Sequence, residues 1–165
     1  MTRSRAGLAV AVLHVALVGS LSLKLLVDRS RFPHAWARTV PFDPSTPLRG
    51  RYVRLAVQIP LVGAPLPPSY AEPGVELRAM NDRVLGAIDS GRSVPRVQVR
   101  SRDTTSSVTL AEPVAFFIPE HVPDPSIRPP SEELWVELTL PPGEWPRPVR
   151  LGVMRSGVLT PLELR

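Results

Sequence analysis

The chain has 165 residues, 21 prolines, no cysteine and a net charge of +5. This length accommodates one domain and an anchor, and the absence of cysteine excludes a disulfide framework, a thiolate zinc site and a cysteine nucleophile. The positive charge is concentrated in residues 1–38, which carry six basic residues and one acidic residue, whereas residues 39–165 carry fourteen arginines and fourteen acidic residues. A nucleic-acid partner would need a basic face, so the net charge does not indicate one.

The first predicted element is a membrane helix. Residues 6–23 read AGLAVAVLHVALVGSLSL, which contains no formal charge, and basic residues flank this run on both sides. A run of this length can cross the hydrocarbon core as one helix, so residues 1–27 are predicted to be a transmembrane anchor that contacts lipid through residues 6–27. We expect a retained anchor rather than a cleaved signal, because the small-residue pattern Ala35-Trp36-Ala37 lies far beyond the apolar run.

The basic residues around this helix give two answers about its orientation. Two arginines precede the apolar run and four basic residues follow it, up to Arg38, which alone would place the C-terminal side in the cytoplasm. A short N-terminal tail before a signal-like helix, however, usually stays inside. We expect a single-pass membrane protein of the bacterial cell envelope whose soluble domain is extracytoplasmic.

A proline-rich linker is predicted after the anchor, over residues 28–48. Pro41, Pro44 and Pro47 recur every three residues, which favours an extended and semi-rigid chain. The remaining residues, 49–165, are predicted to form one β-rich domain, since prolines throughout this region disfavour long helices.

Alternation of apolar and polar residues predicts short strands in this domain. The predicted strands cover residues 52–59, 94–100, 108–118 with a break near Pro113, 134–140, and a final hairpin formed by 149–154 and 158–164. One short helix is predicted over residues 75–88, because Leu77, Met80, Val84, Leu85 and Ile88 form an apolar stripe at helical spacing. The fold class is therefore mostly β: a small β-sandwich or open barrel with one short helix, after an N-terminal transmembrane helix.

The start of the first predicted strand resembles a family signature. Residues 47–55 read PLRGRYVRL and are similar to the motif of the GDYXXLXY family of small bacterial membrane-anchored proteins, whose function is uncharacterised. Gly50, Tyr52 and Leu55 match this motif, whereas Arg51 stands in place of the family's Asp and Val57 in place of its last Tyr. A second landmark of the family, an aromatic strand ending in Pro-Glu, is similar to Phe116-Phe117-Ile118-Pro119-Glu120.

The resemblance implies an N-terminal membrane helix and a small exported domain, and it implies no known activity or cofactor. The family-like positions are Arg49, Gly50, Tyr52, Leu55, Phe116, Phe117, Pro119 and Glu120. Tyr52 and Arg54 are predicted to share the outer face of their strand, where they are available to a partner, although the simpler interpretation is that Tyr52 covers a sheet edge.

Few residues in the chain have the spacing that catalysis needs. Glu120, His121 and Asp124 form an acid–histidine cluster in which a carboxylate could orient a general base, but the neighbouring prolines favour a solvated loop. The arginines at 92, 96, 100 and 102 could meet an anionic lipid or polysaccharide, although a solvated strand face is the simpler interpretation. His14 lies inside the apolar run, where a contact between helices is more common than a ligand role.

These observations favour a non-catalytic β-rich domain that acts as an envelope interaction or structural module. We expect no enzymatic activity, no catalytic or metal-ligating residues and no cofactor, and we expect another membrane protein as the partner. Two alternatives remain: an envelope hydrolase that uses Glu120, His121 and Asp124, and a lipid- or glycan-binding domain with an apolar cavity or an arginine-lined groove. The sequence identifies no small-molecule ligand.

Overall fold

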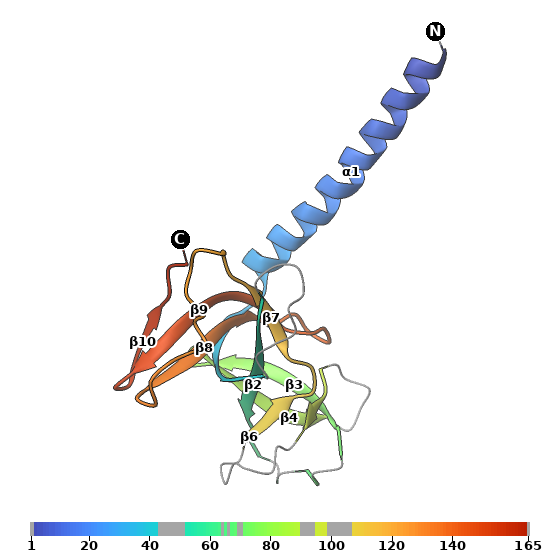
Figure 1. The fold of residues 1–165 in the computed structure, drawn as a ribbon. Helices are drawn as coiled ribbons and strands as arrows, with labels where there is room; N and C mark the ends of the chain where they lie inside the picture. Colours follow the sequence, from blue (N-terminus) through green and yellow to red (C-terminus); the bar gives the residue numbers. More distant parts are fainter. Residues whose placement is uncertain are drawn as a thin grey trace. The chain divides into compact units, whose positions relative to one another are not determined.

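The structure is a computed structural model that describes residues 2–42, 52–63, 65, 67–68, 71–89, 95–98 and 107–164. The chain divides into two compact units, Met1–Phe32 and Pro33–Arg165. The first unit contains the helix α1 (Thr2–Arg31), which ends directly before Phe32 and Pro33, where the chain cannot easily remain helical. The predicted N-terminal apolar helix is therefore confirmed (Figure 1).

α1 has the dimensions of a membrane span. Its segment Gly7–Arg31 has 25 residues and a mean hydropathy of 2.1, so among the described residues it is the one helix long and apolar enough to cross a bilayer. Its described side chains from Gly7 onward are exposed, including Leu13, Val15 and Leu21. These properties are consistent with a signal anchor or a signal sequence.

The second unit is an open sheet that contains, in the described part of the chain, ten strands. Their bounds are β1 (His34–Pro41), β2 (Tyr52–Pro60), β3 (Gly74–Met80), β4 (Arg83–Asp89), β5 (Val97–Gln98), β6 (Ser107–Leu110), β7 (Val114–Phe117), β8 (Glu132–Thr139), β9 (Arg147–Arg155) and β10 (Val158–Pro161). The main order is β10-β9-β8-β1-β2-β6-β5, with β7 on β2 and the hairpin β3–β4 joined through β4 to β1 (Figure 1). The described pairs are antiparallel, except for β1 with β4 and one isolated bridge between Leu61 and Gly86.

One face of the sheet holds the apolar core. Side chains at alternate positions of the strands are buried there, because a strand directs successive side chains to opposite faces. In β2 these are Val53, Leu55, Val57 and Ile59, in β8 Leu134, Val136 and Leu138, and in β9 Leu151 and Val153. The mostly β fold class is thus confirmed, with one open sheet as its form.

The predicted linker over residues 28–48 is wrong over its middle part. Residues 34–41 form β1, which pairs with β8 through Ala35 and Ala37 and with β2 through Thr39 and Val40. Ala35, Ala37 and Thr39 are buried on the core side. These residues are small, so the strand lacks the large apolar side chains by which sequence alternation is usually detected.

The predicted helix over residues 75–88 is also wrong, since β3 and β4 form a hairpin there. Asn81 and Asp82 have φ angles of 50° and 59°, which is the conformation of a two-residue turn that matches strand twist. Met80 pairs with Arg83 to close the turn, and Met80 is 55% exposed rather than part of a buried stripe. The hairpin aligns seven residue pairs, and its backbone hydrogen bonds replace those of a helix.

The other predicted strands agree with the structure where it describes them. The predicted 52–59 and 134–140 strands correspond to β2 and β8, the break near Pro113 separates β6 from β7, and the final hairpin is β9–β10. This last turn uses Ser156 and Gly157, with φ angles of 49° and 83°. Of the predicted 94–100 strand, Val97 and Gln98 form β5.

Candidate functional site

The two family-like landmarks lie on neighbouring strands. Tyr52 of β2 pairs with Phe117 of β7, and Val53 pairs with Phe116, although the two segments are more than sixty residues apart in sequence. The Tyr52 and Phe117 rings meet edge to face with centroids 5.5 Å apart and an interplanar angle of 68°. Their side chains are nevertheless 56% and 55% exposed. An exposed aromatic pair of this kind offers a surface for binding.

A second aromatic contact extends this surface. The Arg54 guanidinium lies 5.5 Å from the centroid of the Phe42 ring, and the Phe42 backbone N–H donates a hydrogen bond to the Arg54 carbonyl oxygen. Arg54 is exposed and shares its face of β2 with Tyr52. We call Phe42, Tyr52, Arg54 and Phe117 the aromatic patch.

The remaining family-like positions are dispersed around this patch. Leu55 is completely buried in the core, and Phe116 is half-buried and packs against it. Pro119 is half-buried and Glu120 is exposed in the loop after β7. Arg49 and Gly50 lie outside the described residues.

A pocket with a volume of about 440 Å³ lies farther along the same outer face. It opens where β1 changes partners, because Arg38 of β1 lies opposite Trp135 of β8 on one side and Gln58 of β2 on the other. β4 approaches at the same point through the pair of Trp36 with Arg83. We call this the junction pocket; its polar and aromatic lining consists of Trp36, Arg38, Gln58, Arg83, Ser107 and Trp135.

Two tryptophans in this lining are held by arginines. The Arg83 guanidinium lies 4.0 Å from the Trp135 ring centroid, and that of Arg150 lies 5.4 Å from the Trp36 ring centroid. Arginine stacks on indole faces through cation–π attraction. Trp36 also contacts Gly152 of β9. The contact is so close that a Cβ atom added to this glycine would lie 2.7 Å from the Trp36 ring. A side chain at position 152 would therefore force this ring to move.

The acidic residues of β8 each bind basic partners nearby. Glu133 forms an ion pair with Arg38 at 3.0 Å and accepts a hydrogen bond from the Trp135 indole at 3.3 Å. Glu137 accepts a hydrogen bond from Arg150 Nε at 2.5 Å and lies 3.5 Å from His34 Nδ1. His34 and Glu137 are far apart in sequence, so no local pattern predicts this pair.

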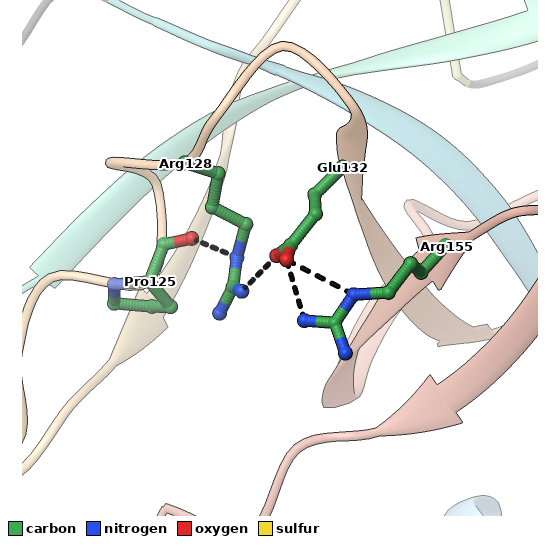
Figure 2. Close-up of polar contacts among 4 residues, drawn as sticks. All are labelled: Pro125, Arg128, Glu132 and Arg155. Atoms are coloured by element: carbon green, nitrogen blue, oxygen red, sulfur yellow. Dashed lines mark hydrogen bonds and ion pairs between the residues drawn. The ribbon is translucent and has the colours of Figure 1, made fainter.

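The end of β8 carries a further ion-pair network. Figure 2 shows Arg128 and Arg155 meeting the Glu132 carboxylate, with Arg128 Nη1 2.9 Å from Oε2 and Arg155 Nε 3.0 Å from Oε1. Arg128 Nε also donates a hydrogen bond to the Pro125 carbonyl oxygen. Hydrogen bonds from Arg155 and then from Arg128 lower the pKa of Glu132 below its ordinary 4.5. The network fastens the loop before β8 to β9 and has a structural role.

Of the acid–histidine cluster, Asp124 takes part in a local turn. One Asp124 carboxylate oxygen accepts hydrogen bonds from the Ser126 backbone N–H at 2.8 Å and from its hydroxyl at 2.7 Å, which is a local turn motif. Glu120 and His121 are exposed in the loop before it. Within the described residues, His, Asp and Glu side chains form no group of three that could hold a metal ion.

The other candidate residues are placed singly. Arg96 is exposed, whereas Arg92, Arg100 and Arg102 lie outside the described residues. The His14 Nδ1 donates a hydrogen bond to the Val10 carbonyl oxygen, 2.9 Å away on the preceding turn of α1. This contact satisfies one polar atom of the ring within the helix itself.

Sequence reasoning indicated part of the aromatic patch and missed the junction pocket. Tyr52 and Arg54 were expected on one outer face because they alternate with buried residues in β2. The pocket draws on β1, β2, β4, β6 and β8, so its members converge only through the topology of the sheet. Comparisons of the chain with protein-family models, with curated proteins and with solved structures found no match.

Proposed function

We propose that this chain is a single-pass membrane protein whose sheet unit acts outside the cytoplasm as a non-catalytic interaction module for another membrane protein. The aromatic patch is the observation that carries this proposal. Tyrosine, phenylalanine and arginine are enriched at protein interfaces, and here Tyr52, Arg54 and Phe117 are exposed together on β2 and β7, beside the half-buried Phe42. The positive charge of Arg54 favours a partner with an acidic group facing the patch.

The position of Ala35-Trp36-Ala37 supports a retained anchor. These residues lie in β1, where they pair with β8 and are 1%, 8% and 2% exposed. Cleavage after Ala37 would remove most of the strand segment that joins β8 to the sheet. Retention of α1 keeps β1 intact and holds the sheet unit near a bilayer, where the partner is also confined to two dimensions.

We also propose kinship with the GDYXXLXY family. The support is the pairing of its two landmark segments, Tyr52 with Phe117 and Val53 with Phe116, across β2 and β7. The family has no established activity, so this kinship adds an architecture and not a reaction.

Site-specific photo-crosslinking in cells tests the proposed interface. Phe117→p-benzoylphenylalanine places the probe in the patch, and the same replacement at Val158 of β10, which is 65% exposed, provides the matched control. We expect an adduct with one integral membrane protein from position 117 only, and Arg54→Glu should abolish it. Equal adducts from both positions, or an adduct insensitive to Arg54→Glu, would contradict the proposal.

Fractionation of the same cells tests the anchor. The intact chain, including residues 1–32, should remain in the membrane fraction after washing with high salt and alkaline carbonate. A shortened chain in the soluble fraction would contradict retention of α1.

A further inference from the structure

The junction pocket has a volume and a lining that suit a small organic ligand. Its volume of about 440 Å³ falls in the range of ligand-binding pockets, which are mostly apolar with a few placed polar groups. Leu61 and Leu85 add aliphatic surface to the two indoles of Trp36 and Trp135. A ligand body that is planar or apolar would find matching walls here.

The walls of this pocket are fixed before any ligand binds. Trp36 is 8% exposed and lies against Gly152, while Trp135 is held by a hydrogen bond from its indole to Glu133 and by the stacked Arg83 guanidinium. Rings in fixed positions lose little conformational entropy on binding.

The charge of the pocket is not balanced. Arg38 is neutralised by Glu133, but in the described part of the chain Arg83 forms no ion pair, and its Nη1 is buried without a hydrogen-bond partner. A buried charged donor that lacks an acceptor is unfavourable. Arg83 also lines the pocket, so an anionic group that enters there would supply the negative charge that this guanidinium lacks.

A second cavity shows the contrast. It has a volume of about 570 Å³ and is lined by prolines and by residues of β3. Of its charged lining residues, Glu76 and Arg78 lie 2.9 Å apart and neutralise each other, and Asp89 has an interaction partner as well. Glu144 of the same lining pairs with Arg147 at 2.6 Å. Volume alone therefore does not identify a binding site. The junction pocket differs from the second cavity in that it contains Arg83, which forms no ion pair with the described residues.

We propose that the junction pocket binds a small molecule that carries one carboxylate on a planar or apolar body. The carboxylate pairs with the Arg83 guanidinium, and the body packs against the aromatic and aliphatic lining that Trp36, Trp135 and the two leucines provide. A single negative charge matches the single unbalanced arginine, which favours a carboxylate over a dianionic phosphate monoester. This inference goes beyond the proposed docking function and does not depend on it.

Nuclear magnetic resonance of the full chain in nanodiscs of zwitterionic lipid tests the proposal, with 2-naphthoate as the probe and the neutral 2-naphthamide as its matched control. The indole N–H signals of Trp36 and Trp135 should shift with naphthoate, while that of Trp145, which is not in the pocket lining, should not. Naphthamide should bind at least about tenfold more weakly, as expected for loss of a charge-assisted hydrogen bond.

Three substitutions locate the interaction. Arg83→Gln should weaken naphthoate binding by about tenfold or more, whereas Arg78→Gln, an exposed arginine on the same hairpin, should leave it unchanged. Because Arg83→Gln could also disturb the fold, Arg83→Lys provides a second variant that retains the charge and should bind with intermediate affinity.

Four results would overturn the proposal. These are equal affinity for naphthoate and naphthamide, the absence of indole shifts at millimolar naphthoate, full affinity in a folded Arg83→Gln variant, and tighter binding of 2-naphthyl phosphate than of naphthoate. The crosslink from position 117 is independent of all four, so failure here and failure of the docking function are distinguishable.

Discussion

On one face of β8, Leu134, Val136 and Leu138 are buried among apolar side chains of β1, β2 and β9. On the other face, Glu133, Trp135 and Glu137 are surrounded by arginines, a histidine and a second tryptophan. The same eight-residue strand thus takes part in two different environments. The inner face is covered by other apolar side chains, whereas the outer face extends to Arg83, whose Nη1 has no hydrogen-bond partner among the described residues.

This difference indicates how the two faces are used. A closed apolar face contributes stability because it removes hydrocarbon from water. A polar face whose charges are paired contributes little to stability, since exposed ion pairs are weak. Its value lies in orienting side chains, and here the paired residues hold two indoles in place beside Arg83, which forms no ion pair with the residues that the structure describes. Stability and binding should therefore respond to substitutions on opposite faces.

The largest expected effect is on the inner face. Leu138→Ala should destabilise the fold by about 2–5 kcal/mol, because Leu138 is fully buried and its removal leaves a cavity. Glu133→Ala on the outer face of the same strand should cost less than about 1 kcal/mol, because its ion pair with Arg38 is half-exposed. Urea unfolding of the full chain in detergent, followed by tryptophan fluorescence, measures both. Equal losses in the free energy of unfolding for the two variants would contradict the proposal that the two faces differ in their contribution to stability.

A glycine tests whether the outer face also has a packing requirement. Gly152→Ala should destabilise the fold by about 1–3 kcal/mol, because the new methyl group would overlap the Trp36 ring. The contacted atoms, Cζ3 and Cη2, belong to the six-membered ring of the indole. In a Trp36→Phe background, which removes part of that ring, Gly152→Ala should cost less. A cost that is the same in both backgrounds would mean that another contact, such as the Thr160 carbonyl oxygen, is responsible.

The strands with large alternating side chains were predictable from sequence, and those with small ones were not. β2 and β8 place Leu, Val and Ile on the core face, and both were expected close to their true bounds. β1 places Ala35, Ala37 and Thr39 there, so its sequence carries little hydrophobic signal. In the β3–β4 hairpin the turn residues are Asn81 and Asp82, which tolerate positive φ but are a weaker signal than Asn-Gly.

The candidate sites follow the same rule. Tyr52 and Arg54 could be placed on one face because both belong to a strand with a clear period of two. Their partner Phe117 was noticed only through a family resemblance, since strand pairing is a long-range property. Nothing near Trp36, Arg83 or Trp135 in the sequence indicates that these three side chains share a pocket.

The aromatic pair offers a smaller test of the outer face. A double-mutant cycle with Tyr52→Ala and Phe117→Ala should give a coupling energy of about 0.5 kcal/mol, because the edge-to-face contact is real but half-exposed. Tyr52→Ala, combined with the probe at position 117, should weaken the crosslink from the patch more than it weakens the fold. A coupling above about 1.5 kcal/mol would mean that the pair mainly stabilises the sheet, and it would weaken the case for an interface.

The smallest expected effect is the pH dependence of the stability that Glu132 contributes. Because the folded-state pKa of Glu132 is lowered by hydrogen bonds from Arg155 and then Arg128, its contribution to stability is present above the ordinary value of 4.5 and is lost as the pH falls through the lower folded value. Arg155 is 69% exposed, so solvent screens this contribution and high salt should reduce it. Unfolding midpoints of wild type and Glu132→Gln should therefore differ most above pH 5 and converge as the solution is acidified toward pH 3. A difference that stays constant with pH would show that Glu132 acts through its shape and neutral hydrogen bonds. The ion pairs of Glu132 with Arg128 and Arg155 would then contribute nothing to the stability of the outer face.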